Sequence, residues 1–133
     1  MRVKAKKSRK AVELVALVAG GAESPRPCII VDPKVVEGLE LRSFRSEVYV
    51  VEEASSITKA YVIPNAVKLE LIDDKGYVLS AITADLVVQE GLFEPMITDV
   101  TIDMLGIQVV SFSKGLWRHI NDPEGIVRES VKK

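Results

Sequence analysis

Histidine and cysteine often carry metal-ion or nucleophilic chemistry, and each occurs once in this chain. His119 is the only histidine and Cys28 the only cysteine. Zinc sites draw their ligands from clusters of Cys and His, so we expect no metal ion. Cys28 lies in an apolar run, whereas a reactive thiolate favours an electropositive and exposed setting. The sequence therefore predicts a small core residue at Cys28 and no catalytic role for His119.

Anion binding has two candidate features. Gly20-Gly21 is not part of a G-x-x-x-x-G-K-[ST] loop, so we expect neither phosphate binding nor a cofactor. Basic side chains gather near the N-terminus, at Arg2, Lys4, Lys6, Lys7, Arg9 and Lys10. One interpretation is contact with nucleic-acid phosphates. The simpler one is a solvated hairpin whose lysines protect an edge strand from aggregation.

Size and composition indicate one ordinary globular domain. The chain has 133 residues, of which 47% are hydrophobic and 28% charged, and its net charge of −1 gives no general attraction to nucleic acid or anionic membranes. No apolar run approaches the roughly 18 residues that span a bilayer, and the segment after the basic N-terminus is a poor signal peptide. A single cysteine favours the cytoplasm. Side-chain amides are few, which is typical of thermophiles: Asn65, Asn121, Gln89 and Gln108.

The positioning elements begin with a predicted β-hairpin. Polar and apolar residues alternate in two segments, Arg2–Lys6 and Val12–Val18, and the basic turn Lys7–Lys10 joins them. The second strand is nearly all apolar, which is typical of a strand buried on both faces. Ala19–Ala22 then interrupts the pattern with two glycines, which permit a tight turn.

Two helices and several further strands follow. Asp32-Pro33, after the strand Cys28–Val31, is an N-cap and first-turn signal for a short helix. Thr98 is the predicted N-cap of a longer helix that ends at Gly106. Runs rich in β-branched and aromatic residues predict strands at 47–51, 59–63, 66–72, 77–88, 107–110 and 116–120, with a hairpin turn at 73–76. We expect a single domain over residues 1–120 and a charged C-terminal tail over residues 121–133.

Three segments together resemble the retropepsin-like aspartic protease family. Leu17-Val18-Ala19-Gly20-Gly21-Ala22 stands where that family carries Leu-Val-Asp-Thr-Gly-Ala. Val35–Leu41 looks like its short helix, and Met96-Ile97-Thr98-Asp99 followed by Leu105-Gly106-Ile107 looks like its second landmark. The likeness covers about residues 1–112, and archaeal proteins of this fold end in a similar Gly-Leu-Trp tail. The resemblance implies a mainly β fold: a small closed β-barrel of acid-protease topology with one short and one modest helix.

The resemblance also implies a homodimer without the family's catalytic group. In the family, each of two chains supplies one aspartate, and the paired carboxylates share a proton and activate water. Ala19 occupies the aspartate position and Gly20 the threonine position, ahead of Gly21. A methyl group neither accepts nor donates a proton. We therefore expect no catalytic residue in this degenerate motif and no peptide hydrolysis.

The resemblance defines a candidate groove at Ala22, Glu23, Thr98 and Asp99. Glu23 stands where the family often has an acid paired with an arginine of the second helix, and Asp99 stands at that arginine's position. One interpretation is a relocated carboxylate pair with raised pKa. The other is that Asp99 serves the helix N-terminus while Glu23 meets Arg26 or solvent.

Three hypotheses for function follow, and the first is our main one. A homodimeric peptide-binding, protein-binding or regulatory protein would use a surviving groove, which could take an extended peptide as an added strand. An aspartic-type hydrolase would use Glu23 or Asp99 as a non-standard carboxylate. A nucleic-acid-associated factor would use the basic N-terminal hairpin.

Overall fold

The computed structural model describes residues 1–5, 10–39, 47–53, 56–92 and 94–131. It is mainly β with two helices, as predicted. The elements in chain order are β1 (Arg2–Ala5), β2 (Ala11–Glu13), β3 (Leu17–Val18), β4 (Cys28–Val31), α1 (Pro33–Gly38), β5 (Glu47–Glu53), β6 (Ser56–Ile72), β7 (Val78–Gln89), β8 (Met96–Ile97), α2 (Asp99–Leu105), β9 (Ile107–Ser111), β10 (Leu116–His119) and β11 (Arg128–Glu129). Residues 6–9, within the predicted basic turn, and residues 40–41, at the end of the predicted short helix, lie outside the described residues.

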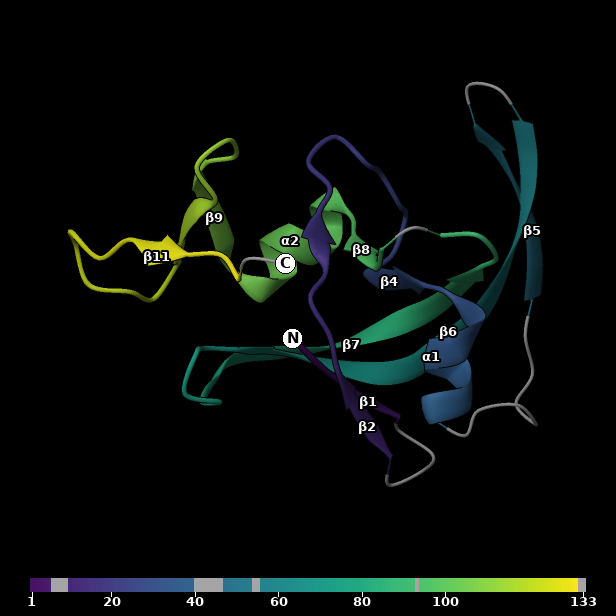
Figure 1. The fold of residues 1–133 in the computed structure, drawn as a ribbon, viewed down its shortest axis with the longest axis horizontal. Coiled ribbons are helices and arrows are strands. Elements are labelled where there is room, and N and C mark those ends of the chain that lie inside the picture. Colours follow the sequence, from purple (N-terminus) through teal and green to yellow (C-terminus); the bar gives the residue numbers. More distant parts are fainter. Residues whose placement is uncertain (6–9, 40–46, 54–55, 93, 132–133) are drawn as a thin grey trace.

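The larger sheet curls around the core in the order β2-β1-β6-β7-β4-β8-β3, with β5 paired to β6 (Figure 1). Pairing is antiparallel except between β4 and β7 and between β3 and β8. The side chains of this sheet and of α2 that are fully buried include Ile29, Val67, Leu69, Leu86, Ile97 and Leu105. Burying each such side chain contributes about 1.5–3 kcal/mol.

The prediction of a closed barrel is wrong. The strands at the two ends of this order, β2 and β3, do not pair with each other in the described part of the chain. Both belong to one extended segment, which changes partner along its length. Leu14 N–H bonds Met1 O beside β1 at 2.9 Å, and Leu17 N–H bonds Pro95 O beside β8 at 2.8 Å. The single strand predicted at Val12–Val18 is therefore two short strands.

The long β6–β7 hairpin forms the central pair of strands of the sheet. Its turn is stabilised by the Asp73 carboxylate, which accepts hydrogen bonds from the amides of Lys75 and Tyr77. The two strands predicted at 59–63 and 66–72 form one strand, because a bulge between Ile63 and Val67 absorbs the extra residues. Asn65 takes φ 49° in this bulge, and the Asp85 carboxylate accepts its N–H at 2.8 Å.

Local signals mark the start of both helices and the end of α2. Asp32 caps α1, because its carboxylate accepts the Lys34 N–H at 2.7 Å and Pro33 takes the first helical position. Thr98 is the N-cap residue of α2, although its hydroxyl does not cap the helix. Gly106 ends α2 in the left-handed region, at φ 77°. Among the described residues, neither helix is long and apolar enough to cross a bilayer.

A small sheet, β11-β10-β9, lies to one side of the larger one (Figure 1). Part of the predicted tail, residues 121–133, is thus a strand rather than a free end. Arg128 of β11 donates two hydrogen bonds of 2.8 Å to the Asp122 carboxylate and lies over the Trp117 ring, 5.7 Å from its centre. The hydrogen bonds from Arg128 and from the His119 amide hold the pKa of Asp122 well below its usual value. This ion pair fastens β11 to β10.

Candidate functional site

The degenerate motif forms a tight turn after β3, as predicted. Ala19 N–H bonds Ile97 O at 3.1 Å, and Ala22 N–H bonds Ala19 O at 3.0 Å. Gly21 takes φ 92°, a conformation that residues with a side chain rarely adopt. Gly20 is exposed, and a Cβ placed there would lie 3.0 Å from the Phe112 ring. The turn therefore requires glycine and presents backbone and methyl groups, with no acid of its own.

Asp99 fastens this turn to the start of α2. Its carboxylate Oδ1 accepts the Gly21 N–H at 2.8 Å, while its own N–H bonds Ala22 O at 2.8 Å. A carboxylate at this position also interacts favourably with the positive end of the helix. Asp99 is thus a structural anchor that positions residues 19–22.

The structure brings together three of the four candidate groove residues. Ala22 and Asp99 are hydrogen-bonded, and Thr98 precedes Asp99 on the same segment. Glu23 is exposed and makes no ion pair or hydrogen bond within the described ranges. Arg26, its expected partner, instead bonds Asp85 at 2.9 Å and Asn65 at 2.6 Å. No contact between Glu23 and Asp99 supports a shared proton.

A chain of hydroxyl groups beneath the turn was not predicted. Thr98 Oγ1 lies 2.6 Å from Ser24 Oγ and 3.1 Å from Thr101 Oγ1. Thr101 is fully buried, and its hydroxyl accepts the Cys28 N–H at 2.9 Å and donates to Cys28 O at 3.0 Å. These bonds attach α2 to the start of β4. Cys28 is buried, in agreement with its predicted role in the core.

His119 likewise has a structural role. The ring is buried, with Nε2 3.0 Å from Leu105 O, and Nδ1 accepts the Asn121 N–H at 3.2 Å. A carbonyl oxygen only accepts, so Nε2 is the donor in this hydrogen bond. The imidazole therefore ties the end of α2 to β10. The described residues hold no cluster of side chains suited to a metal ion.

The basic cluster is partly neutralised within the fold. Arg2 pairs with Glu13 at 3.1 Å and Glu70 at 3.4 Å, and Lys4 pairs with Glu70 at 3.1 Å. These two cations face carboxylates of β2 and β6. Lys6, Lys7 and Arg9 lie outside the described residues.

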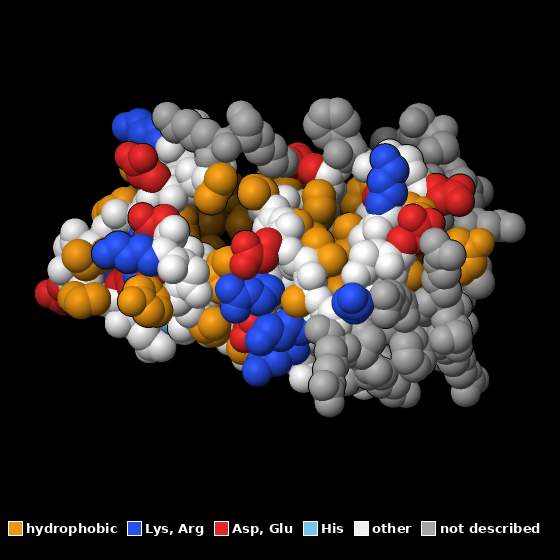
Figure 2. Space-filling model, turned by 60° about the horizontal axis from the view of Figure 1, so that its bottom comes forward, with side chains coloured by type: hydrophobic (Ala, Val, Ile, Leu, Met, Phe, Trp, Pro, Cys, Tyr) orange, Lys and Arg blue, Asp and Glu red, His pale blue; other side chains and the backbone are white. Residues whose placement is uncertain are grey.

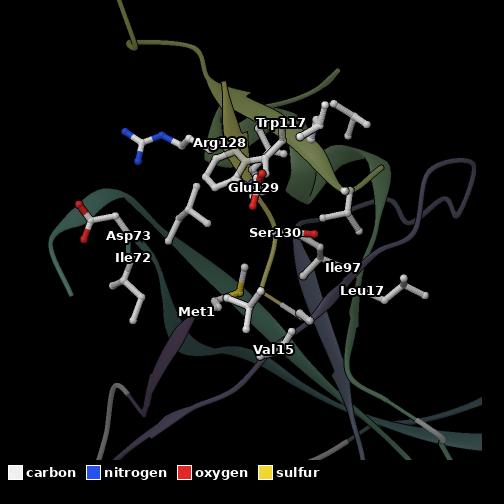
Figure 3. A pocket seen from close by; sticks show the side chains of 18 of the residues that line it. Met1, Val15, Leu17, Ile72, Asp73, Ile97, Trp117, Arg128, Glu129 and Ser130 are labelled. Atoms are coloured by element: carbon white, nitrogen blue, oxygen red, sulfur yellow. The ribbon is translucent and has the colours of Figure 1, made fainter. Parts of the chain in front are cut away.

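An open apolar pocket of about 810 Å³ lies between the curled sheet and the small sheet. Figure 2 shows one face of the molecule, on which hydrophobic side chains surround a hollow. Trp117 of the small sheet lies across the pocket from Val15 (Figure 3). Its apolar wall includes Leu14, Val15, Leu17, Ile97, Val109 and Phe112. No motif in the sequence predicted this pocket; the nearest signal was the nearly all-apolar composition of Val12–Val18.

Several wall residues remain exposed to solvent. The exposed fractions are 41% for Val15, 44% for Leu17 and 68% for Phe112. Charged residues lie at the rim, and Arg128 and Asp73 are on the same side of the pocket (Figure 3). An apolar cavity with a charged rim is the usual form of a ligand-binding site.

Comparisons of the chain with protein-family models, with curated proteins and with solved structures gave no match.

Proposed function

We propose that this chain is a binding protein without peptidase activity, and that its apolar pocket takes an extended polypeptide segment. The observation that carries the proposal is the open cavity of about 810 Å³ with exposed Val15, Leu17 and Phe112 on its wall. Its size falls within the roughly 300–1,000 Å³ typical of ligand pockets. Exposed apolar groups that adjoin one another mark interaction sites on soluble proteins.

A retropepsin-like ancestry is part of the proposal. Its support is the order of the elements and the glycine turn of residues 19–22, which lies against the start of α2. Hydrolysis by that family's mechanism needs a proton-transferring group at the turn, and Ala19 offers a methyl group there. The Asp99 carboxylate accepts a hydrogen bond from the Gly21 N–H, and Glu23 is exposed without a second carboxylate of the described residues in contact with it.

The test is selection from a phage-displayed library of random peptides, followed by fluorescence anisotropy with the enriched peptides. The informative variant is Val15→Glu, which places a charge on the pocket wall at a residue that tolerates exposure. Val78→Glu is the matched control, because Val78 is 47% exposed and lies outside the pocket.

We expect Val15→Glu to weaken binding at least tenfold and Val78→Glu to leave it within about twofold, since a buried charge is costly and an exposed one is not. Equal binding by both variants would place the site elsewhere and refute the proposal. So would a selection that enriches no binding peptide.

A further inference from the structure

Val15 and Leu17, on the wall of the pocket, belong to a segment with the composition of a buried strand. Val12–Val18 is apolar at six of its seven positions, a pattern typical of strands with both faces buried. In the structure Leu14, Ala16 and Val18 pack against the core, whereas Val15 and Leu17 are exposed, and all five residues line the pocket. Val15 and Leu17 are therefore apolar side chains that remain exposed, in a segment whose composition is typical of a strand buried on both faces.

The backbone of the same segment lacks partners at its centre. Leu14 bonds toward Met1 on one side, and Leu17 bonds toward Pro95 on the other. Between them, the amides and carbonyls of Val15 and Ala16 have no protein partner in the part of the chain that the structure describes. Both residues line the pocket. Because neighbouring residues of an extended segment direct their backbone groups to opposite edges, each edge offers one unpaired N–H and one unpaired C=O for pairing with another strand.

The charged side chains at the rim are mostly acidic. The ionisable side chains that line the pocket are four carboxylates and one guanidinium: Glu13, Asp73, Asp74, Glu129 and Arg128. Arg128 is already paired with Asp122, and Glu13 with Arg2. Asp74 and Glu129 are exposed and make no ion pair within the described ranges. A ligand with cationic groups beside its apolar part would therefore complement this rim.

We infer that the occupant of the pocket is an extended peptide that adds a strand beside Val15–Ala16. Its alternate apolar side chains fill the pocket, and a lysine or arginine near an end meets Asp74 and Glu129. This inference rests on the proposed function and gives it a binding mode and a ligand class. Main-chain pairing supplies sequence-tolerant affinity, while the pocket and the rim select apolar and basic residues.

The probe is the fluorescein-labelled peptide Lys-Val-Thr-Val-Thr-Lys, whose near-symmetric ends serve either strand direction. Two derivatives carry the same number of N-methyl groups, one set on the Val amides and the other on the Thr amides. Alternate amides of a strand point to opposite sides, so pairing at one edge uses only one set. We expect one derivative to bind about tenfold more weakly and the other to bind within about twofold of the parent.

The charge test replaces both lysines of the probe with glutamate. We expect affinity to fall at least fivefold, and the lysine probe to weaken as salt rises from low to physiological concentration. The double variant Asp74→Lys/Glu129→Lys should reverse the preference between the two peptides. Glu124→Lys is the control, because Glu124 is exposed and lies outside the pocket.

Failure of this inference is distinguishable from failure of the proposed function. If both N-methyl derivatives bind like the parent while Val15→Glu still abolishes binding, the pocket binds peptide without strand addition. If the glutamate peptide binds equally well, the basic ligand class is wrong. If no peptide binds and sedimentation shows a dimer that Val15→Glu dissociates, a second copy of the chain fills the pocket and both proposals are overturned.

Discussion

Thr101→Val is the sharpest test of how the candidate site is held in place. The substitution keeps the shape of the side chain and removes the hydroxyl, which serves both the N–H and the C=O of Cys28. Thr101 is fully buried and Cys28 is 4% exposed, so water cannot replace the lost partner. Each backbone group left unpaired in the interior costs about 1–3 kcal/mol. For two such groups we therefore expect a loss of about 2–6 kcal/mol in the free energy of unfolding.

The control at the same position is Thr101→Ser, which keeps the hydroxyl and removes one methyl group. Its expected cost is about 1 kcal/mol from lost burial and a small cavity. A second control, Thr83→Val, lies on an exposed position of β7 and should change stability by less than about 0.5 kcal/mol. The order of the variants, with valine worse than serine at residue 101, distinguishes the hydrogen bonds from packing.

The assays are unfolding by guanidinium chloride and unfolding by heat, each followed by far-ultraviolet circular dichroism and by fluorescence of Trp117. For a domain of this size, each kcal/mol corresponds to roughly 4 °C in melting temperature. Thr101→Val should then melt at least about 8 °C below the wild type, and Thr101→Ser about 4 °C below it. A valine variant as stable as the serine variant would refute the assigned role of the hydroxyl.

Three further predictions concern charge, catalysis and assembly. Burial raises the pKa of Glu70, but hydrogen bonds from Lys4 and Arg2 outweigh it and leave the pKa below its usual value, so the carboxylate stabilises the fold at neutral pH. Glu70→Gln should lower the free energy of unfolding by about 1 kcal/mol at pH 7. This difference in the free energy of unfolding from the wild type should shrink as pH falls below about 4, because the wild-type carboxylate then becomes protonated. A difference in urea unfolding that stays constant across that range would contradict this prediction. The wild type should cleave no unfolded polypeptide between about pH 3 and 8, whereas cleavage blocked by a transition-state analogue of aspartic proteases would disprove it. If two copies associate about the turn of residues 19–22, sedimentation at micromolar concentration should give the mass of a dimer. Ala19→Arg should reduce that mass to the mass of a monomer, because two like charges would meet on the symmetry axis. A dimer that persists in the Ala19→Arg variant would exclude that interface.

Features that depend on neighbouring residues could be predicted from the sequence. Asp32 before Pro33 and Gly106 after an apolar stripe mark helix boundaries through local hydrogen bonds and backbone conformation, and both signals proved reliable. The need for glycine at residue 21 likewise follows from a tight turn. The pairing partner of each strand depends on residues that are distant in sequence and could not be predicted from neighbouring residues. Val12–Val18 has the pattern of one strand, and only its pairing first with β1 and then with β8 divides it.

The pocket could not be predicted for the same reason. Its two walls come from segments that are far apart in sequence, and its volume depends on where the small sheet lies against the larger one. The hydroxyl chain of Ser24, Thr98 and Thr101 joins residues more than seventy positions apart, since Thr98 lies 74 residues after Ser24. Neither feature leaves a spacing that the sequence alone reveals.

Hydrogen bonds hold the small sheet against the end of α2 and so position one wall of the pocket. The Ile120 N–H bonds Gly106 O at 2.8 Å, and the His119 ring bonds Leu105 O, so β10 is fixed to the end of α2. A Cβ at Gly106 would lie 2.9 Å from His119 Nε2, which leaves no room for a larger residue at this junction. A movement of the small sheet away from α2 would break these hydrogen bonds. A ligand would therefore meet a preformed site and would lose little free energy to rearrangement, which favours measurable affinity even for a short peptide.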